Sequence, residues 1–329
     1  MKRNLAKLAA FVLAAAVCFG GLVWLKHRYS HWACPPNLGL RGLRAGGGTD
    51  LLLVGSSLTR SAYDLKQLEK LTGRRGYVLA YNGLDPAFMY PLLRQALADP
   101  GIRVDTVVVE ATAGIACLPP ALRDTNLFLH APPAVKDAYL ELLRAQPGGL
   151  PWREEYDLIV ASKNADIMFH PIAGPLVGHT YYHGAFVSGP PGSVSPRKFL
   201  ALKPMATERQ PLNERQLAAM EAIFRLLRER GVRAIFVEPA EPAPVLAVPE
   251  VRENRARLRH LIEAAGFAFV DAGEGFPNDN PKNFLDGRHL SRVGRRLATE
   301  RLAAILAPPD ATKLLQERPT PNAERPTPK

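Results

Sequence analysis

Residues 50–63, DLLLVGSSLTRSAY, run from a short apolar segment through a glycine and two serines into a helix-like segment. Residues 51–54 are continuously apolar, as expected for a strand that is buried on both faces of a parallel sheet. A serine directly after such a strand is either the N-cap of the next helix or a nucleophile. The stretch therefore predicts a buried strand, a turn and a helix, and it makes Ser56 and Ser57 candidate functional residues.

The alternation of strand and helix continues along the chain. Further short apolar runs predict strands at residues 77–81, 106–109, 234–237 and 267–270. Apolar residues at helical spacing predict helices over residues 61–71, 87–97, 132–145, 217–227, 251–265 and 293–306. This order is typical of an α/β protein with three layers. We predict a mainly parallel five-stranded sheet with helices on both faces.

The N-terminus carries a segment that is apolar enough to enter a bilayer. After the basic start MKRNLAK, residues 8–25 contain 18 residues without a charge, and Lys26, His27 and Arg28 follow. Such a run is near the lower limit for spanning the hydrocarbon core. We expect a single N-terminal transmembrane anchor in the cytoplasmic membrane, with the bulk of the chain outside the cytoplasm, in the periplasm. A cleaved signal peptide that releases a secreted protein is the alternative.

Composition divides the chain into three parts. Residues 1–34 are the expected anchor and juxtamembrane segment, residues 35–307 the main folded domain, and residues 308–329 a proline-rich polar tail that we expect to be disordered. Within the domain, residues 117–211 are rich in Pro, Gly and His and lack clear periodicity. We expect them to form an insertion after the third strand that caps or lines a site.

The net charge, the histidines and the cysteines do not point to a specific ligand or partner. The net charge of +11 comes mainly from arginines on amphipathic helices, and no nucleic-acid-binding motif accompanies it, so we predict no nucleic-acid partner. His179 and His183 have a metal-like spacing, but no carboxylate or cysteine cluster joins them, and we predict neither a metal nor an organic cofactor. Cys34 and Cys117 either form a disulfide or remain thiols.

Polar residues follow the ends of the predicted strands, where open parallel sheets bind their ligands. Ser57 follows the first strand and Gly83 the second, while Asp286 and His289 come after the fifth strand, at the predicted entrance to the last helix. A serine nucleophile needs a base within hydrogen-bond reach, and the base needs an orienting partner. Ser57, His289 and Asp286 supply these three parts.

Two segments resemble blocks of a known superfamily. GSSLT at residues 55–59 resembles the GDSLT block of the SGNH/GDSL hydrolases, with Ser56 where aspartate usually stands. DGRHLSRVG at residues 286–294 is similar to the closing Asp-x-x-His block of that superfamily. The resemblance implies an SGNH/flavodoxin-like fold and a nucleophile at Ser57.

The resemblance also implies how the remaining residues act. It gives His289 as the base and Asp286 as the residue that orients it. The backbone N–H groups of Ser57 and Gly83 would stabilise the oxyanion. The third block of the family supplies an asparagine to the oxyanion hole, but the corresponding sequence here is VVVEATAG, which contains Glu110 and no asparagine. We expect Asn82 to take its place.

With these departures, the sequence is similar to a divergent, membrane-anchored branch of the superfamily. That branch includes the D-alanyl transfer protein of teichoic acid synthesis and the alginate O-acetylation proteins. The resemblance covers residues 51–114 and 216–306, so the insertion has no counterpart in it. It implies an acylated envelope glycan or lipid as substrate, and a membrane-bound O-acyltransferase as a partner.

Three further residues are candidate substrate contacts. Arg60 lies three residues after Ser57 and could meet an acidic group, while Tyr181 and Tyr182 could stack on a sugar ring. The structural alternatives are an exposed arginine in the first turn of a helix and local packing of the insertion.

The sequence thus favours an extracytoplasmic serine esterase or O-acyltransferase that acts by a Ser-His-Asp mechanism. The alternative is a catalytically silent module of the same fold that binds or scaffolds glycan at the membrane. The acyl group, the acceptor and the choice between hydrolysis and transfer stay open, because the same triad serves both reactions.

Overall fold

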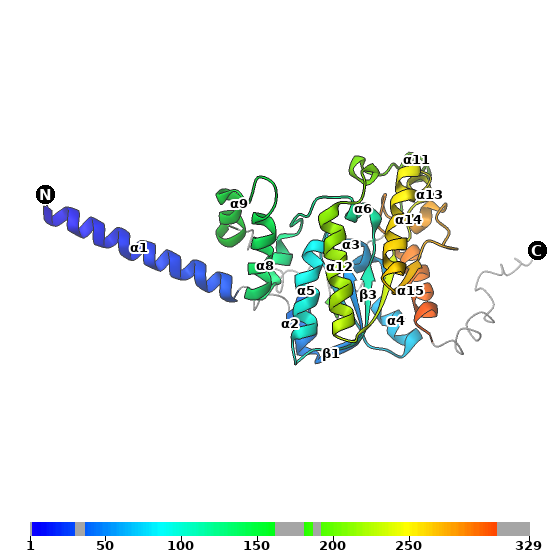
Figure 1. The fold of residues 1–329 in the computed structure, drawn as a ribbon, viewed down its shortest axis with the longest axis horizontal. Helices are drawn as coiled ribbons and strands as arrows, with labels where there is room; N and C mark the ends of the chain where they lie inside the picture. The colour runs from blue at the N-terminus through cyan, green and yellow to red at the C-terminus, as the bar shows by residue number, and fades with distance from the viewer. Residues whose placement is uncertain (1, 30–36, 162–180, 187–191, 308–329) are drawn as a thin grey trace, which may run out of the picture.

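The structure is a computed structural model that describes residues 2–29, 37–161, 181–186 and 192–307 (Figure 1). Its centre is a five-stranded sheet with the order β2-β1-β3-β6-β7, in which all neighbouring strands are parallel. The strands are β1 (Gly48–Gly55), β2 (Gly76–Ala80), β3 (Arg103–Glu110), β6 (Arg233–Glu238) and β7 (Ala268–Asp271). Counted within the sheet alone, this is the 2-1-3-4-5 order of doubly wound, flavodoxin-like folds. The predicted fold class is confirmed.

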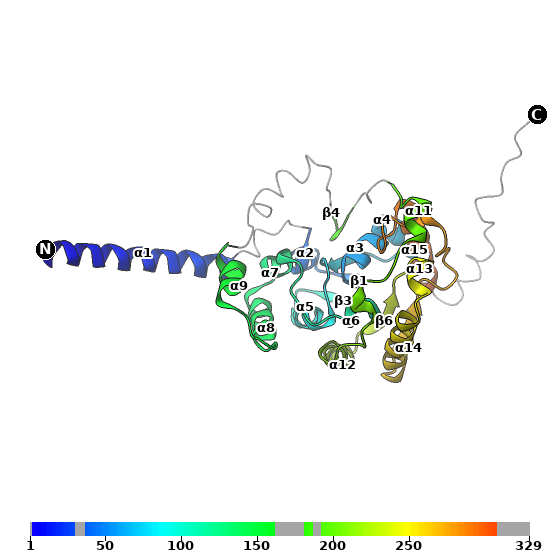
Figure 2. The same cartoon turned by 90° about the horizontal axis from the view of Figure 1, so that it is seen from above.

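Helices cover both faces of the sheet, as the view from above shows (Figure 2). Leu52 and Val54 of β1 face one hydrophobic core, and Leu51 and Leu53 face the other. The first core includes residues of α2 (Gly39–Ala45), α5 (Pro86–Ala98), α8 (Pro133–Arg144), α12 (Glu214–Glu229) and α14 (Pro249–Ala264). The second includes residues of α3 (Ser57–Ala62), α4 (Leu65–Thr72) and α15 (Arg292–Leu306). Because both faces of β1 are covered, its sequence is apolar without alternation.

The helix predicted over residues 61–71 is two helices, and this prediction was wrong in its extent. Helix α3 begins directly after the serine turn, and Tyr63 is extended with φ −122° and ψ 133°. Asp64 then caps α4, because its carboxylate accepts a hydrogen bond from the Gln67 N–H at 3.3 Å. The break lets the chain change direction at Tyr63 and Asp64, and Leu65 and Leu68 of α4 reach the core.

The last helix begins later than the residues expected at its entrance. Helix α15 starts at Arg292, and the Ser291 hydroxyl caps it by accepting from the Gly294 N–H at 3.3 Å. The helix predicted over residues 293–306 is confirmed, and Asp286 and His289 lie in the irregular turn that leads into it. A Cβ on Gly294 would lie 2.1 Å from the Asn283 carbonyl oxygen, so the glycine lets this turn pack closely on the helix.

Between β3 and β6 lies the segment predicted as an insertion. Helix α6 (Ala113–Ala116) precedes it. The segment itself contains α7 (Thr125–His130), α8, α9 (Trp152–Tyr156), the π-helical turn η2 (Asp157–Ala161), the hairpin β4 (Tyr181–Tyr182) and β5 (Ala185–Phe186), α11 (Pro196–Leu200) and the 3₁₀ turn η3 (Ala206–Arg209). The helix predicted over residues 132–145 is confirmed as α8. The hairpin covers the outer edge of the sheet, since the Val78 N–H donates to the His183 carbonyl at 2.8 Å. Two short elements follow β6, namely α13 (Ala243–Leu246) and the 3₁₀ turn η4 (Pro281–Asn283).

At the N-terminus, helix α1 (Lys2–Tyr29) extends away from the sheet (Figure 1). Its segment Asn4–Leu25 has a mean hydropathy of 2.4 and is not buried by the rest of the chain, so its length and composition suit a membrane span. A membrane anchor and a signal sequence both fit these properties. Cys34 and the tail 308–329 lie outside the described residues, and the predictions made for them, like the domain boundaries, stay predictions.

Candidate functional site

The candidate site begins where β1 ends. Gly55 is buried, and a Cβ at this position would lie 2.3 Å from the Thr59 Oγ1 and 2.5 Å from the Glu110 Oε2. No side chain fits there without a shift of its neighbours. The glycine of the Gly-Ser-Ser turn is therefore explained by close packing against the end of β3.

The two serines of the turn have different surroundings. The buried Ser56 hydroxyl donates to Glu110 Oε1 at 2.7 Å and accepts from the Leu58 N–H at 3.1 Å, so it is the N-cap of α3. The Ser57 hydroxyl is partly exposed, and its Oγ lies 2.9 Å from His289 Nε2. Ser56 therefore takes the cap, and Ser57 is the serine whose hydroxyl faces His289.

His289 connects Ser57 to Asp286. Its Nδ1 lies 2.8 Å from Asp286 Oδ2, while Asp286 Oδ1 accepts from the N–H groups of Arg288 and His289, each at 2.8 Å. Partial burial acts to raise the pKa of Asp286, but the hydrogen bonds from the His289 ring and the two amides lower it to about 2. The ionised carboxylate favours the tautomer with the proton on Nδ1, which leaves Nε2 as an acceptor facing Ser57.

This arrangement joins segments that are 232 residues apart in the sequence. Ser57 follows β1, and Glu110 ends the neighbouring strand β3. The strand order reverses between β1 and β3, so Ser57 lies at the switch point where doubly wound folds bind their ligands. The structure thus brings together the three residues predicted as catalytic, and their roles are proposed below.

The residues predicted for the oxyanion hole lie in the loop after β2. Gly83 has a φ of 60°, and a Cβ there would lie 2.8 Å from the Cδ of Arg123. The Asn82 N–H donates to Asp124 Oδ2 at 2.9 Å, and the Asn82 Oδ1 accepts from an Arg60 guanidinium nitrogen. Arg60 and Asn82, predicted separately, are therefore hydrogen-bonded neighbours.

The tyrosines predicted to contact substrate lie in the hairpin over β2. The Tyr182 hydroxyl donates to Glu69 Oε2 at 2.6 Å, and the Lys66 ammonium lies 5.2 Å from the centre of its ring. These contacts hold Tyr182 on α4 rather than on Ser57. The Tyr181 side chain and His179 lie outside the described residues. Among the residues described, no group of three or more His, Cys, Asp or Glu is placed to hold a metal ion.

Sequence reasoning missed the part played by Glu110. The sequence marked it only as standing where an asparagine was expected. In the structure its carboxylate contacts both sides of the serine turn. The signal that could have found it is a carboxylate at the last position of a buried strand, next to the strand that ends in Gly-Ser-Ser.

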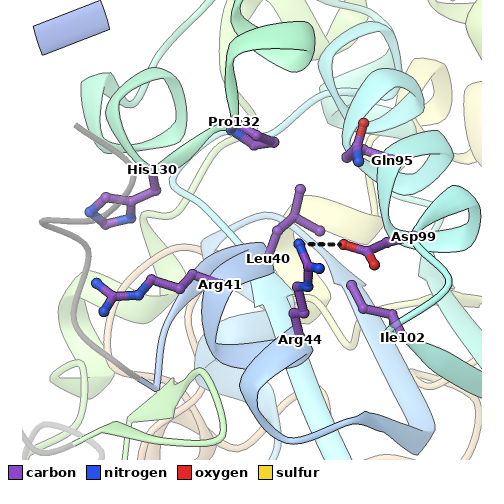
Figure 3. A pocket seen from close by; sticks show the side chains of 8 residues that line it. All are labelled: Leu40, Arg41, Arg44, Gln95, Asp99, Ile102, His130 and Pro132. Carbon is purple, nitrogen blue, oxygen red and sulfur yellow. Dashed lines mark ion pairs between the residues drawn. The ribbon is translucent and has the colours of Figure 1, made fainter. Parts of the chain in front are cut away.

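Cavities also occur away from the triad in the described part of the chain, and two of them can be placed relative to it. One, of about 150 Å³, is lined by residues of α2, the end of α5, the start of β3 and the α7–α8 connection (Figure 3). Since α5 ends and β3 begins at the amino edge of the sheet, this cavity is at the edge opposite Ser57. The other, of about 820 Å³, is lined by Arg123 and Asp124 together with residues of the segments 120–125, 143–150 and 154–158. It therefore borders the Asn82–Gly83 loop.

Fold and site together define a doubly wound α/β protein with a Ser-His-Asp arrangement at the carboxyl edge of its sheet. No protein-family model and no curated protein matches the chain. Among solved structures, it is similar to a proposed platelet activating factor from Streptococcus pneumonia, at 13% identity and TM-score 0.43, with 90% of this chain and 99% of that chain covered.

Two other solved structures are similar to the chain. A proposed acylhydrolase from Bacteroides fragilis has 12% identity and TM-score 0.40, over 83% of this chain and 94% of that chain. A proposed SGNH hydrolase from Slackia heliotrinireducens has 14% identity and TM-score 0.38, over 79% and 100%. The chemistry of this site is inferred from its own geometry.

Proposed function

We propose that this protein is a divergent SGNH-like serine esterase or O-acyltransferase. The observation that carries the proposal is the unbroken hydrogen-bond line from Ser57 Oγ through His289 to Asp286, with separations of 2.9 and 2.8 Å. These distances are within the reach that a base needs to take the proton of a nucleophile.

In the proposed reaction, Ser57 Oγ attacks the carbonyl carbon of an ester and its proton passes to His289 Nε2. Asp286 stabilises the imidazolium that forms. The N–H groups of Ser57 and Gly83 stabilise the oxyanion, and the Asn82 Nδ2 is the side-chain donor left beside them, because Oδ1 faces Arg60. His289 then returns the proton to the leaving alkoxide, and an acyl-serine remains.

The second half of the reaction reverses these roles. Water or a carbohydrate hydroxyl loses its proton to His289 Nε2 as its oxygen attacks the acyl-serine. The bond to Ser57 Oγ breaks, and the serine recovers its proton. Hydrolysis and transfer differ only in which of these two acceptors reaches the acyl group.

We further propose that the substrate is an acylated envelope glycan or lipid on the outer side of the cytoplasmic membrane. The apolar helix α1 supports this location, since it suits an N-terminal anchor. The resemblance of GSSLT and DGRHLSRVG to the membrane-anchored branch supports the substrate class. A membrane-bound O-acyltransferase is the proposed partner that would deliver the acyl group.

A catalytically silent module that scaffolds glycan is the second candidate. Two observations favour it. The segment VVVEATAG carries no asparagine for the oxyanion hole. The Asn82 backbone N–H, moreover, is already bound to Asp124.

The experiment that separates these candidates uses the full chain in detergent, with p-nitrophenyl acetate as substrate and a fluorophosphonate to label an active serine. We expect Ser57→Ala to abolish labelling and to lower turnover by at least about 10³-fold. Ser56→Ala is the matched control and should keep labelling within about tenfold of wild type. A wild-type protein that neither turns over nor labels would favour the silent module.

A further inference from the structure

Glu110 is a buried carboxylate with an unusual set of partners. It is 5% exposed and accepts five hydrogen bonds. Oε2 accepts from the Ser56 N–H at 2.8 Å, the Thr59 N–H at 3.0 Å and the Thr59 hydroxyl at 2.6 Å. Oε1 accepts from the Ser56 hydroxyl at 2.7 Å and the Thr112 hydroxyl at 2.9 Å. All five donors are neutral amides or hydroxyls.

These hydrogen bonds bracket the proposed nucleophile. Ser56 and Thr59 lie on either side of Ser57, and their N–H groups bind the same oxygen of Glu110. The backbone of the turn is thereby fixed before and after Ser57. Since α3 has only six residues, little of its own hydrogen bonding could hold this geometry.

The identity of residue 56 fits this arrangement. The Ser56 hydroxyl donates to Glu110 while it accepts from the Leu58 N–H, and a hydroxyl can do both. An aspartate at this position could only accept, and it would face the Glu110 carboxylate as a like charge. Serine at position 56 and glutamate at position 110 therefore match each other chemically.

We propose that Glu110 is a positioning residue that holds the Ser57 hydroxyl in line with His289 Nε2 by fixing the backbone on both sides of it. This inference rests on the proposed function, in which Ser57 is the nucleophile. A carboxylate suits the role because it only accepts, and all five groups around it donate. Glutamine would turn an amide NH₂ toward some of these donors.

The charge of Glu110 also has a counterpart on the other side of the site. Arg288 precedes His289, and its guanidinium forms an ion pair with the buried Glu208. Burial lowers the pKa of Arg288, and the negative charge of Glu110 acts against that shift.

Glu241 provides the matched control. It is as buried as Glu110, at 5% exposure, but it binds Arg255 and makes no hydrogen bond to the serine turn. If activity were lost only because folding needs a buried carboxylate, Glu110→Gln and Glu241→Gln should lose activity to a similar extent. A positioning role predicts that Glu110→Gln alone slows the reaction of Ser57.

The test measures fluorophosphonate labelling rates, kcat and KM with p-nitrophenyl acetate, and amide exchange of the peptide around residues 55–60, all in the full chain. For Glu110→Gln we expect kcat and the labelling rate to fall about 10²-fold, KM to change less than about threefold, and exchange of the turn to rise. Glu110→Asp, which keeps the charge, should recover part of the rate. Glu241→Gln should label within about twofold of wild type.

Several outcomes would overturn the inference. If wild type labels and Glu110→Gln labels as fast, Glu110 does not position Ser57, although the proposed function stands. If wild type does not label, the proposed function fails and the positioning role falls with it. Thr59→Val covers the case in which Glu110→Gln does not fold: loss of one hydrogen bond should slow labelling about threefold to tenfold, and an unchanged rate would refute the inference.

Discussion

Glu110 and Glu238 end neighbouring strands at the carboxyl edge of the sheet, and their surroundings differ completely. Glu110, at the end of β3, accepts five hydrogen bonds from neutral donors. Glu238, at the end of β6, lies 3.2 Å from the Arg255 Nε, and its Oε1 has no hydrogen-bond partner among the described residues. Burial raises the pKa of Glu238 to about 8, although the charge of Arg255 opposes this.

Arg255 is the centre of the region around Glu238, at the carboxyl ends of β6 and β7. Besides Glu238 it binds Glu241 at 3.2 Å and Asp271 at 2.9 Å, so one cation on α14 joins the ends of β6 and β7. The β1–β3 side of the edge holds the proposed reaction centre through hydrogen bonds, whereas the β6–β7 side holds the fold through ion pairs. The comparison shows that two buried glutamates at the ends of neighbouring strands can have different roles. The hydrogen-bond donors and cations around each glutamate determine whether it holds a turn or an ion-pair cluster.

The largest effect that would separate the two regions is expected at Arg255. Arg255→Met leaves three carboxyl groups without their cation, and it should lower the free energy of unfolding by about 3–5 kcal/mol. Labelling of Ser57 in the folded fraction should remain, because the triad makes no contact with Arg255. Denaturant unfolding and fluorophosphonate labelling of the same sample measure the two quantities.

Arg259→Met is the control for that prediction. Arg259 lies on the same helix but forms an exposed pair with Glu263 four residues later. Its loss should cost less than about 1 kcal/mol. The claim is that Arg255 stabilises the fold but does not affect Ser57. It is refuted if Arg255→Met has the unfolding free energy of wild type, or if the folded variant is no longer labelled by the fluorophosphonate.

A second effect, which appears only as the pH changes, is expected from the titration of Glu238. The pKa of Glu238 in the folded state is about 8 against an ordinary value of 4.5, so the folded protein keeps a proton that the unfolded chain releases. Its stabilising contribution is full below pH 4.5 and is lost as the pH rises to 8, with a slope of at most about 1.4 kcal/mol per pH unit. Glu238→Gln should flatten the unfolding free energy measured between pH 5 and 8.

The Asp286 carboxyl should not contribute to that slope. The pKa of Asp286 is lowered to about 2, so its stabilising contribution is complete above its ordinary value of 3.8 and is lost only as the pH falls toward 2. We expect the unfolding free energy of the wild type to fall between pH 3.8 and 2, and Asp286→Asn to reduce that fall. An unchanged fall in Asp286→Asn would contradict the role of Asp286 in this pH range.

The smallest effect is expected at Ser56. Ser56→Ala removes the N-cap of α3 and one of the five hydrogen bonds to Glu110, which should cost about 1 kcal/mol of unfolding free energy. Thermal unfolding measures this, and Ser61→Ala is a suitable comparison, because the Ser61 hydroxyl only bonds back to carbonyls of its own helix. Equal melting temperatures for the two variants would contradict the role of Ser56 as the cap.

Local patterns in the sequence were enough to predict most of the fold. The strands follow from apolar runs that are bounded by Gly, Asn and Asp, and the helices from apolar residues at helical spacing. The division of residues 61–71 into α3 and α4 was missed because the spacing of Leu65 and Leu68 indicates a helix without marking where it begins, and Asp64 is an N-cap only once Tyr63 is extended. The last helix, predicted over residues 293–306, is observed as Arg292–Leu306, because its apolar spacing begins directly after the Ser291 cap.

The sequence by itself determined the strand order along the chain, the serine turn, and Asp286 and His289 as candidates, because each depends on residue types within a few positions. Only the tertiary structure decided which serine faces His289, where Tyr182 lies, and that Glu110 holds the turn. These depend on distances between segments far apart in the sequence, such as the 54 residues from Ser56 to Glu110 and the 232 from Ser57 to His289. The packing of β1 against β3 fixes such distances, and no local pattern encodes them.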